Sequence, residues 1–238
     1  MKNLFLIILF TLLSYSNSLF GQENQWPADL SLMGNAGFIV SPTANISADR
    51  YISVGLHLVH EKAGYTSYSK QEQSAEQVLF TTIGFLPFME VTLRLTKPFG
   101  KQEPRGKYGL GDRSIFLRMQ VLKEKEKLPA ITIAAHDLFS TVSFFNTVYI
   151  VGSKHFELGA NFIAHTSLGY GTRLRETRAE YLQGIFGGVS IQWKNLQAIF
   201  EYDANQFNTG LKCHLWKKVF LQASALDMKY LSGGLALQ

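Results

Sequence analysis

The chain has little cysteine and no long apolar run. Cys213 stands alone among 238 residues, so no internal disulfide can form and a small disulfide scaffold is excluded. No run reaches the ~20 apolar residues that a membrane-spanning helix needs. The net charge of +5 is spread along the chain, without a dense basic stripe interleaved with aromatics, which argues against a nucleic-acid partner. Helical periodicity is also missing after residue 25, which favours an all-β fold.

The N-terminus has the pattern of a secretory signal peptide. Lys2 gives a positive start, an apolar run follows over residues 4–13, and a small, polar stretch leads to Gly21. We expect residues 1–22 to be cleaved off near Gly21 or Gln22, which leaves an exported chain of one domain. The alternative is a retained anchor helix, for which the apolar run is short.

From residue 50 onward, apolar residues alternate with small or polar ones. In residues 52–58 the aliphatic side chains Ile52, Val54 and Leu56 share one face, and Ser53 and His57 fall on the other. Alternation with period 2 is the signal of strands with two different faces. Similar runs recur to the C-terminus, often 9–12 residues long, and they predict about twelve strands, at 90–96, 114–121, 185–194, 196–203 and 210–215 among others.

The connections between these runs alternate in length. Short connections are expected at 87–88, 123–127, 158–159, 194–195 and 217–218, and long ones at 61–76, 97–108, 138–146 and 172–182. Short turns at one end and long loops at the other are typical of an outer-membrane barrel. We therefore expect residues 50–238 to form an antiparallel transmembrane β-barrel, after an N-terminal segment at 23–49 that could add a strand. The alternative is a soluble periplasmic β-sandwich that buries its apolar face and binds a partner protein.

The polar face of the predicted strands would line the lumen of such a barrel. Its mixed charges could pair across the lumen and stiffen the wall, or they could line a path for a sugar chain. Large aromatics mostly fall on the apolar face or near strand ends, as in interfacial girdles, and this counts against the sugar path. The candidate lumen-facing residues are Arg94, Arg118, Glu201, Asp203, Lys212 and His214.

No pattern in the sequence indicates an enzyme, a metal or a cofactor. His136 and Asp137 are adjacent, and neighbours on a strand face opposite sides. Glu201 and Asp203 are the only acidic pair on one face, and at this spacing they are too close to flank a glycosidic bond. We therefore expect a non-enzymatic protein, with an outer-membrane enzyme of lipid or sugar as a further alternative.

Several motifs together resemble one family. The chain resembles the YjbH-like outer-membrane proteins associated with bacterial exopolysaccharide production, and the similar segments follow in order: "GNAGFIVSPTANISADRYISVGL", "GLGDRSIFLRMQVL", "PAITIAAHDLFSTVSFFNTVYIVGSKHF", "LGYGT" and "EYDANQFNTGLKCHL". The sequence departs from the pattern at His136, where small residues are common, and in lacking a terminal aromatic. Within these motifs we expect structural roles for Pro42, Thr43, Asp112, Asp137, Ser153 and Lys154.

The resemblance implies a β-barrel of the outer membrane of a Gram-negative cell. Its expected role is in making or exporting an extracellular polysaccharide, without catalysis. The expected partners are outer-membrane lipid, the exopolysaccharide itself and proteins of the export machinery.

Overall fold

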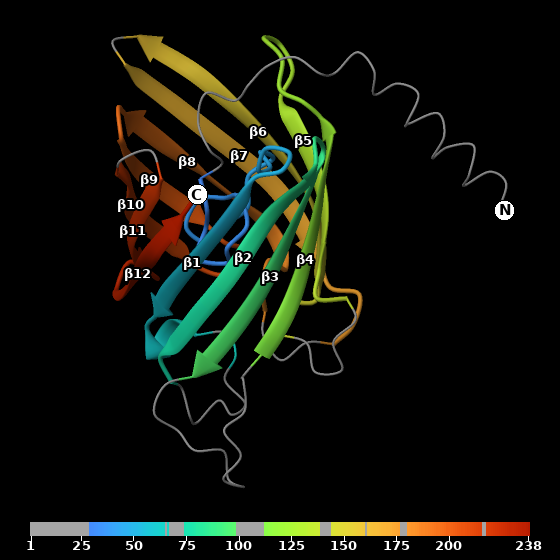
Figure 1. The fold of residues 1–238 in the computed structure, drawn as a ribbon, viewed down its shortest axis with the longest axis vertical. Coiled ribbons are helices and arrows are strands. Elements are labelled where there is room, and N and C mark those ends of the chain that lie inside the picture. Colours follow the sequence, from blue (N-terminus) through green and yellow to red (C-terminus); the bar gives the residue numbers. More distant parts are fainter. Residues whose placement is uncertain are drawn as a thin grey trace, which may run out of the picture.

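The computed structural model describes residues 29–64, 66, 74–98, 112–138, 144–159, 161–176, 180–215 and 218–238. Within these ranges the chain forms twelve strands in one closed antiparallel barrel (Figure 1). Each strand pairs with its neighbours along the chain, and β1 pairs with β12 to close the sheet. The prediction of an all-β barrel of about twelve strands is confirmed. The two-sheet sandwich is wrong, because a single sheet closes on itself. The expected signal peptide at 1–22 lies outside the described residues.

The strands occupy most of the described chain. They are β1 (Ile52–Val59), β2 (Glu76–Leu86), β3 (Met89–Pro98), β4 (Asp112–Leu122), β5 (Ala130–His136), β6 (Thr147–Gly159), β7 (Phe162–Thr172), β8 (Gly184–Trp193), β9 (Leu196–Tyr202), β10 (Phe207–Leu215), β11 (Val219–Leu226) and β12 (Tyr230–Leu237). A short 3₁₀ helix, η2 (Glu61–Ala63), follows β1. Among the described residues, no helix is long and apolar enough to cross a membrane.

The period-2 pattern places the apolar face outside. In β1, Ile52 and Leu56 are exposed by 58% and 42%, whereas Ser53 and His57 between them are buried. The same alternation runs through β4, where Ile115 is exposed and Arg118 is buried. A barrel with aliphatic side chains outside and polar ones inside has the reverse of the usual soluble arrangement. The core is therefore the interior of the barrel, where polar and aromatic groups lie with buried aliphatic side chains such as Ile39 and Val151.

The two ends of the barrel differ. The end with the tight turns 87–88 and 194–195, where β6 also leads to β7 and β10 to β11, is called the short-turn end from here on. The opposite end carries the connections 60–75, 99–111, 137–146 and 173–183 and is called the long-loop end. The expected alternation is wrong at three connections: 203–206 and 227–229 at the long-loop end are short, and 123–129 at the short-turn end is longer than its neighbours.

Both ends of the barrel sheet lie at the short-turn end. Ile52, which begins β1, pairs with Ile83 beside the turn between β2 and β3. Leu237, at the end of β12, pairs with Val219 beside the turn between β10 and β11. The segment that precedes β1 therefore meets the barrel at the end where the turns are tight.

Candidate functional site: the occupied interior of the barrel

The segment before β1 lies inside the barrel. Residues 29–48, called the plug from here on, are almost entirely buried from Leu30 to Ser47 and form the blue segment among the strands in Figure 1. One stem begins at Asp29, whose side chain meets His214 close to the short-turn end of β10. The other stem ends at Ala48, whose carbonyl oxygen lies against Gly84 near the end of β2. The plug therefore enters and returns at the short-turn end.

Tight turns of its own backbone shape the plug. Two isolated bridges join Leu30 to Ala36 and Gly37 to Pro42, and no other β-pairing is found in the described N-terminal segment. Gly34 has a φ of +92°, which favours glycine, and a Cβ there would lie 2.6 Å from a ring carbon of Phe80. This segment adds no strand to the barrel, because its backbone pairs with itself.

The tip of the plug is held by one carboxylate. Glu201, on β9 near the long-loop end, accepts the backbone N–H groups of Ile39, Val40 and Ser41 at 2.9, 2.8 and 3.1 Å. The amide of Asn208 donates to the same carboxylate at 2.9 Å. A buried carboxylate is costly without partners, and hydrogen bonds to a charged group contribute about 1.5–3 kcal/mol each. Glu201 therefore fixes the turn at the tip through its main chain.

A buried ion pair holds the middle of the plug. Arg118 Nη1 on β4 lies 2.8 Å from Glu90 Oε1 on β3, and both side chains are fully buried. Glu90 also accepts the N–H of Ala36 at 3.2 Å and both the N–H and the hydroxyl of Ser47 at 2.7 and 2.8 Å. The guanidinium of Arg118 donates in turn to the carbonyl oxygen of Thr43. The pair joins two neighbouring strands of the wall, and both of its side chains form hydrogen bonds with the plug backbone.

Uncharged wall groups bind the plug at Ala44. Its carbonyl oxygen accepts from Thr132 Oγ1 at 2.6 Å and from Gln120 Nε2 at 2.8 Å. Its N–H donates to Ser153 Oγ at 2.7 Å. Earlier in the plug, Lys212 Nζ donates to the carbonyl oxygen of Gly37 at 2.7 Å. Groups from β4, β5, β6 and β10 thus pair the plug backbone on several sides.

The first stem is tied by a carboxylate and a histidine. Asp29 Oδ1 lies 2.8 Å from His214 Nε2. Burial acts to raise the pKa of Asp29, but the hydrogen bond with His214 and the positive charge of Lys212 outweigh it, so the pKa lies below its usual value. Asp29 therefore stays ionised at neutral pH and anchors the stem at the short-turn end.

Aromatic rings fill the interior beside the plug. Phe116 stacks on His136 with ring centroids 4.0 Å apart, and the hydroxyl of Tyr149 lies 3.1 Å from His136 Nε2. Phe145 and Tyr181, which come from loops at the long-loop end, pack edge to face at 5.3 Å within the same cluster. Large aromatics therefore occur on both faces, because Tyr170 and Trp193 are exposed while Phe116 and Tyr149 are buried. Phe144, Phe145 and Tyr181 lie near strand ends, where a girdle would place them at the surface, but they are buried.

The structure places all six candidate lumen residues in the interior. Arg94, Arg118, Glu201 and Lys212 are at most 1% exposed, as is Asp203 just after β9, and His214 is 9% exposed. Arg118, Glu201, Lys212 and His214 contact the plug directly. Asp203 supports Glu201 through Asn208, which donates to both carboxylates. The guanidinium of Arg94 lies 4.3 Å from the ring centre of Phe145 instead.

Two of the six motif residues belong to the plug. Pro42 closes the bridge with Gly37, and Thr43 gives its carbonyl oxygen to Arg118. Ser153 is the wall partner of Ala44. These three residues therefore serve the contact between plug and wall.

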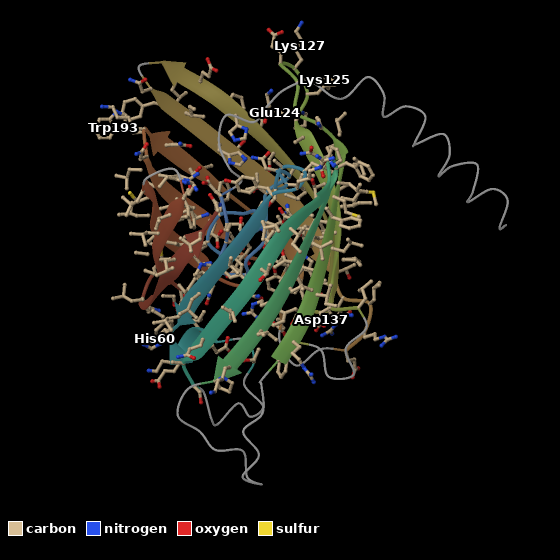
Figure 2. The ribbon with its side chains drawn as sticks, viewed as in Figure 1. His60, Glu124, Lys125, Lys127, Asp137 and Trp193 are labelled. Atoms are coloured by element: carbon tan, nitrogen blue, oxygen red, sulfur yellow. The ribbon has the colours of Figure 1, made fainter. Side chains whose placement is uncertain are left out.

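The other motif residues stabilise the ends of strands. Asp112 accepts a hydrogen bond from the hydroxyl of Ser114, and Asp137 takes a φ of +50° as the chain leaves β5. Lys154 pairs with Glu124 at 3.2 Å, and His155 Nδ1 lies 2.7 Å from the same carboxylate; Glu124 is labelled at the short-turn end in Figure 2. Burial acts to raise the pKa of Glu124, but the hydrogen bonds from His155 and Lys154 lower it overall.

Sequence reasoning missed Glu90 and the whole role of residues 29–48. Glu90 lies on the polar face of β3, four residues before Arg94, so the alternation alone could have placed it inside. Its link to Arg118 needs the register of β3 and β4, in which these two residues are paired. Within the described ranges, no group of three or more His, Cys, Asp and Glu side chains could hold a metal ion.

The geometry defines a class of protein: a closed twelve-strand barrel with an apolar exterior and an interior occupied by its own N-terminal segment. The model of the YjbH family, described as exopolysaccharide biosynthesis protein YbjH, matches residues 30–225. The chain belongs to this family. The match includes the plug from Leu30 and the wall as far as β11, so both parts of the site lie within it. A search of curated proteins finds no match.

Proposed function

We propose that this protein is an outer-membrane β-barrel with a non-enzymatic role in exopolysaccharide production or export. The single observation that carries the membrane placement is the continuous apolar exterior. Exposed aliphatic side chains occur on successive strands around the barrel, such as Leu58, Leu93, Ile115, Ile150 and Leu168. Soluble monomers rarely expose contiguous apolar patches of this extent, whereas lipid solvates them.

Exposed aromatics at both ends support the same placement. Trp193 and Phe162 stack near the short-turn end with ring centroids 6.2 Å apart, and Trp193 is labelled there in Figure 2. Phe200 and Phe207 stack at 5.6 Å near the long-loop end. Aromatic side chains gather at the two interfaces of a bilayer, where their amphipathic or flat rings meet the headgroups. The two clusters would mark the two interfaces.

The contacts of the acidic pair support a non-enzymatic role. Both oxygens of Glu201 accept hydrogen bonds from the plug backbone, and Asn208 joins Glu201 to Asp203. A general acid or base must come within hydrogen-bond distance of the substrate group that it protonates or deprotonates. While the plug is in place, the chain itself occupies Glu201. Without the plug, Asn208 still joins the two carboxylates, which stay close together on one face. An enzyme would instead be indicated if the purified protein hydrolysed a sugar polymer and Glu201→Gln abolished that activity.

The production role is tested by deleting the gene in the native strain and restoring it. We expect exopolysaccharide in the medium to fall on deletion and to return with the full chain. A matched control is the chain with Asp227→Asn, in an exposed turn, which should restore production equally. Unchanged exopolysaccharide after deletion would contradict the proposed function, whatever the location of the protein.

A further inference from the structure

The barrel is complete without the plug. Each strand pairs with two neighbouring strands, and the plug's two bridges are internal to it. Both stems lie at the short-turn end, at Asp29 and at Ala48. The plug can therefore leave as a loop toward the short-turn end. Its departure breaks no strand pairing and threads no chain through the wall.

The wall binds the plug partly through hydrogen bonds that other polar molecules can replace. Apolar packing adds to them, with Leu30 in one cluster with Phe80 and Phe38 edge to face with His165. Glu201, Lys212 and Thr132 contact main-chain N–H and C=O groups, and Glu90 accepts one hydroxyl, that of Ser47. These contacts need donors and acceptors at the right places but hardly depend on the plug's side chains. A sugar hydroxyl both donates and accepts, so a saccharide chain can satisfy the same wall groups.

The wall also has polar capacity that the plug does not use. Gln222 on β11 is 5% exposed, and neither its amide nitrogen nor its amide oxygen has a hydrogen-bond partner among the residues that the structure describes. Gln197 Oε1 on β9 and Ser167 Oγ on β7 are likewise buried without a partner. Buried polar groups are nearly always paired in native structures. Gln222 lies two residues from Phe220 on the buried face of β11, and flat rings next to hydrogen-bonding groups suit a saccharide.

From these observations we infer that the inner wall of the barrel is a saccharide-binding surface, and that the plug occupies it until it is withdrawn toward the short-turn end. The inference rests on the proposed role in exopolysaccharide production. It adds the class of ligand, the wall residues that meet it and the segment that must move. In the state described here, the plug takes the place of the saccharide.

A disulfide between plug and wall tests the inference. In a Cys213→Ser background, Ala44→Cys and Ser153→Cys join the plug to β6, where Ala44 N and Ser153 Oγ are 2.7 Å apart. Thr132→Cys with Ala44→Cys gives a second lock, to β5. The matched control is Ser224→Cys with Ser232→Cys, two directly paired positions on β11 and β12 that join wall to wall. Thiol alkylation confirms each disulfide, and a heat-dependent gel shift confirms each fold.

The locked variants are expressed in the deletion strain, and exopolysaccharide is measured before and after adding dithiothreitol to the medium. We expect the plug locks to reduce output to that of the deletion strain, with recovery on reduction, while the wall lock matches the full chain. Full output from an oxidised plug lock would overturn the inference. If the full chain itself does not restore output, that result contradicts the proposed function, independently of the plug.

Planar bilayers test the surface separately from production. The purified chain with Glu90→Gln and Glu201→Gln should open an ion-conducting path more often than the unaltered chain, and the oxidised plug lock should stay closed. Fragments of the strain's own exopolysaccharide, prepared by mild acid hydrolysis, should block the open current more than polyethylene glycol of equal size. Conductance that the lock leaves unchanged, or equal block by both polymers, would overturn the inference.

Discussion

Val40 at the tip of the plug donates its backbone N–H to the carboxylate of Glu201, 2.8 Å away and 161 positions later in the chain. This contact joins the segment before the first strand to the ninth strand. It lies near the long-loop end, whereas both stems of the plug lie at the short-turn end. The plug therefore spans much of the interior, and the hydrogen bonds to Glu201 hold its tip.

Replacing Glu201 by Gln should loosen the tip. The amide nitrogen would face N–H donors in place of an acceptor oxygen, and each lost hydrogen bond to the charged group costs about 1.5–3 kcal/mol. We expect thiol labelling of Ser41→Cys, in a Cys213→Ser background, to become roughly 10-fold faster or more. Asp227→Asn in an exposed turn serves as the control. Equal labelling rates in both variants would show that Glu201 does not hold the tip.

Breaking the pair of Glu90 and Arg118 should destabilise the protein more than removing both charges. Arg118→Met leaves a buried carboxylate without its cation, which typically costs about 3–5 kcal/mol. We expect the double variant with Glu90→Gln to regain part of that loss. Urea unfolding in detergent gives the free energies for the cycle. Strictly additive losses would mean that the two side chains are not coupled.

The anchor at Asp29 should weaken in acid. Because the pKa of Asp29 in the folded state lies below its ordinary value of 3.8, its ionised form stabilises the fold above that value. This contribution is lost as the pH falls below 3.8 and through the folded-state pKa. Stability measured from pH 7 to pH 2 should therefore fall more steeply for the unaltered chain than for Asp29→Asn. Parallel curves would show that Asp29 does not anchor the first stem.

Gly84 should not tolerate a side chain. A Cβ there would collide with the carbonyl oxygen of Ala48, where the second stem crosses the end of β2. Gly152→Ala is the matched control, since its Cβ meets nothing closer than 3.7 Å. We expect Gly84→Ala to lower the yield of folded barrel or the stability by more than about 1 kcal/mol, and Gly152→Ala to stay within about 0.5. Refolding yield in detergent reports both. Equal yields would place the stem elsewhere.

A charge on the exterior distinguishes lipid from water. Leu168 on β7 is 67% exposed. If it faces the bilayer, Leu168→Arg should cost about 2–4 kcal/mol near the midplane when folding is measured in lipid vesicles. On a water-exposed surface the same change would stay within about 0.5 kcal/mol. The smaller value would contradict a lipid-facing exterior.

The sequence predicted the barrel and the orientation of its residues well, because both depend on local alternation. Period 2 alone places Arg118 and Glu201 on the face opposite Ile115 and Phe200, and the closed sheet keeps those faces apart. The alternating connection lengths were predicted less well after β8. There, tight links such as 203–206 replace the long loops of the first strands.

The plug could not be predicted in the same way. Its segment has no periodicity, and its partners are far away in sequence: Ile39 meets Glu201 across 162 positions, and Ala44 meets Ser153 across 109. The inward direction of the loop aromatics was not predicted, for a related reason. Phe145 and Tyr181 lie outside the strands, where alternation carries no information about direction. What was missing in each case was a contact set by the closed barrel rather than by local sequence.

The central proposal is that the closed barrel lies in the outer membrane. Cells expressing the chain would be fractionated, and the outer-membrane fraction run on a gel with and without boiling. We predict recovery that requires detergent, and an unboiled band that migrates faster than the boiled one, because a closed barrel stays compact in the gel. Recovery in the soluble periplasm, without a shift on boiling, would contradict the account.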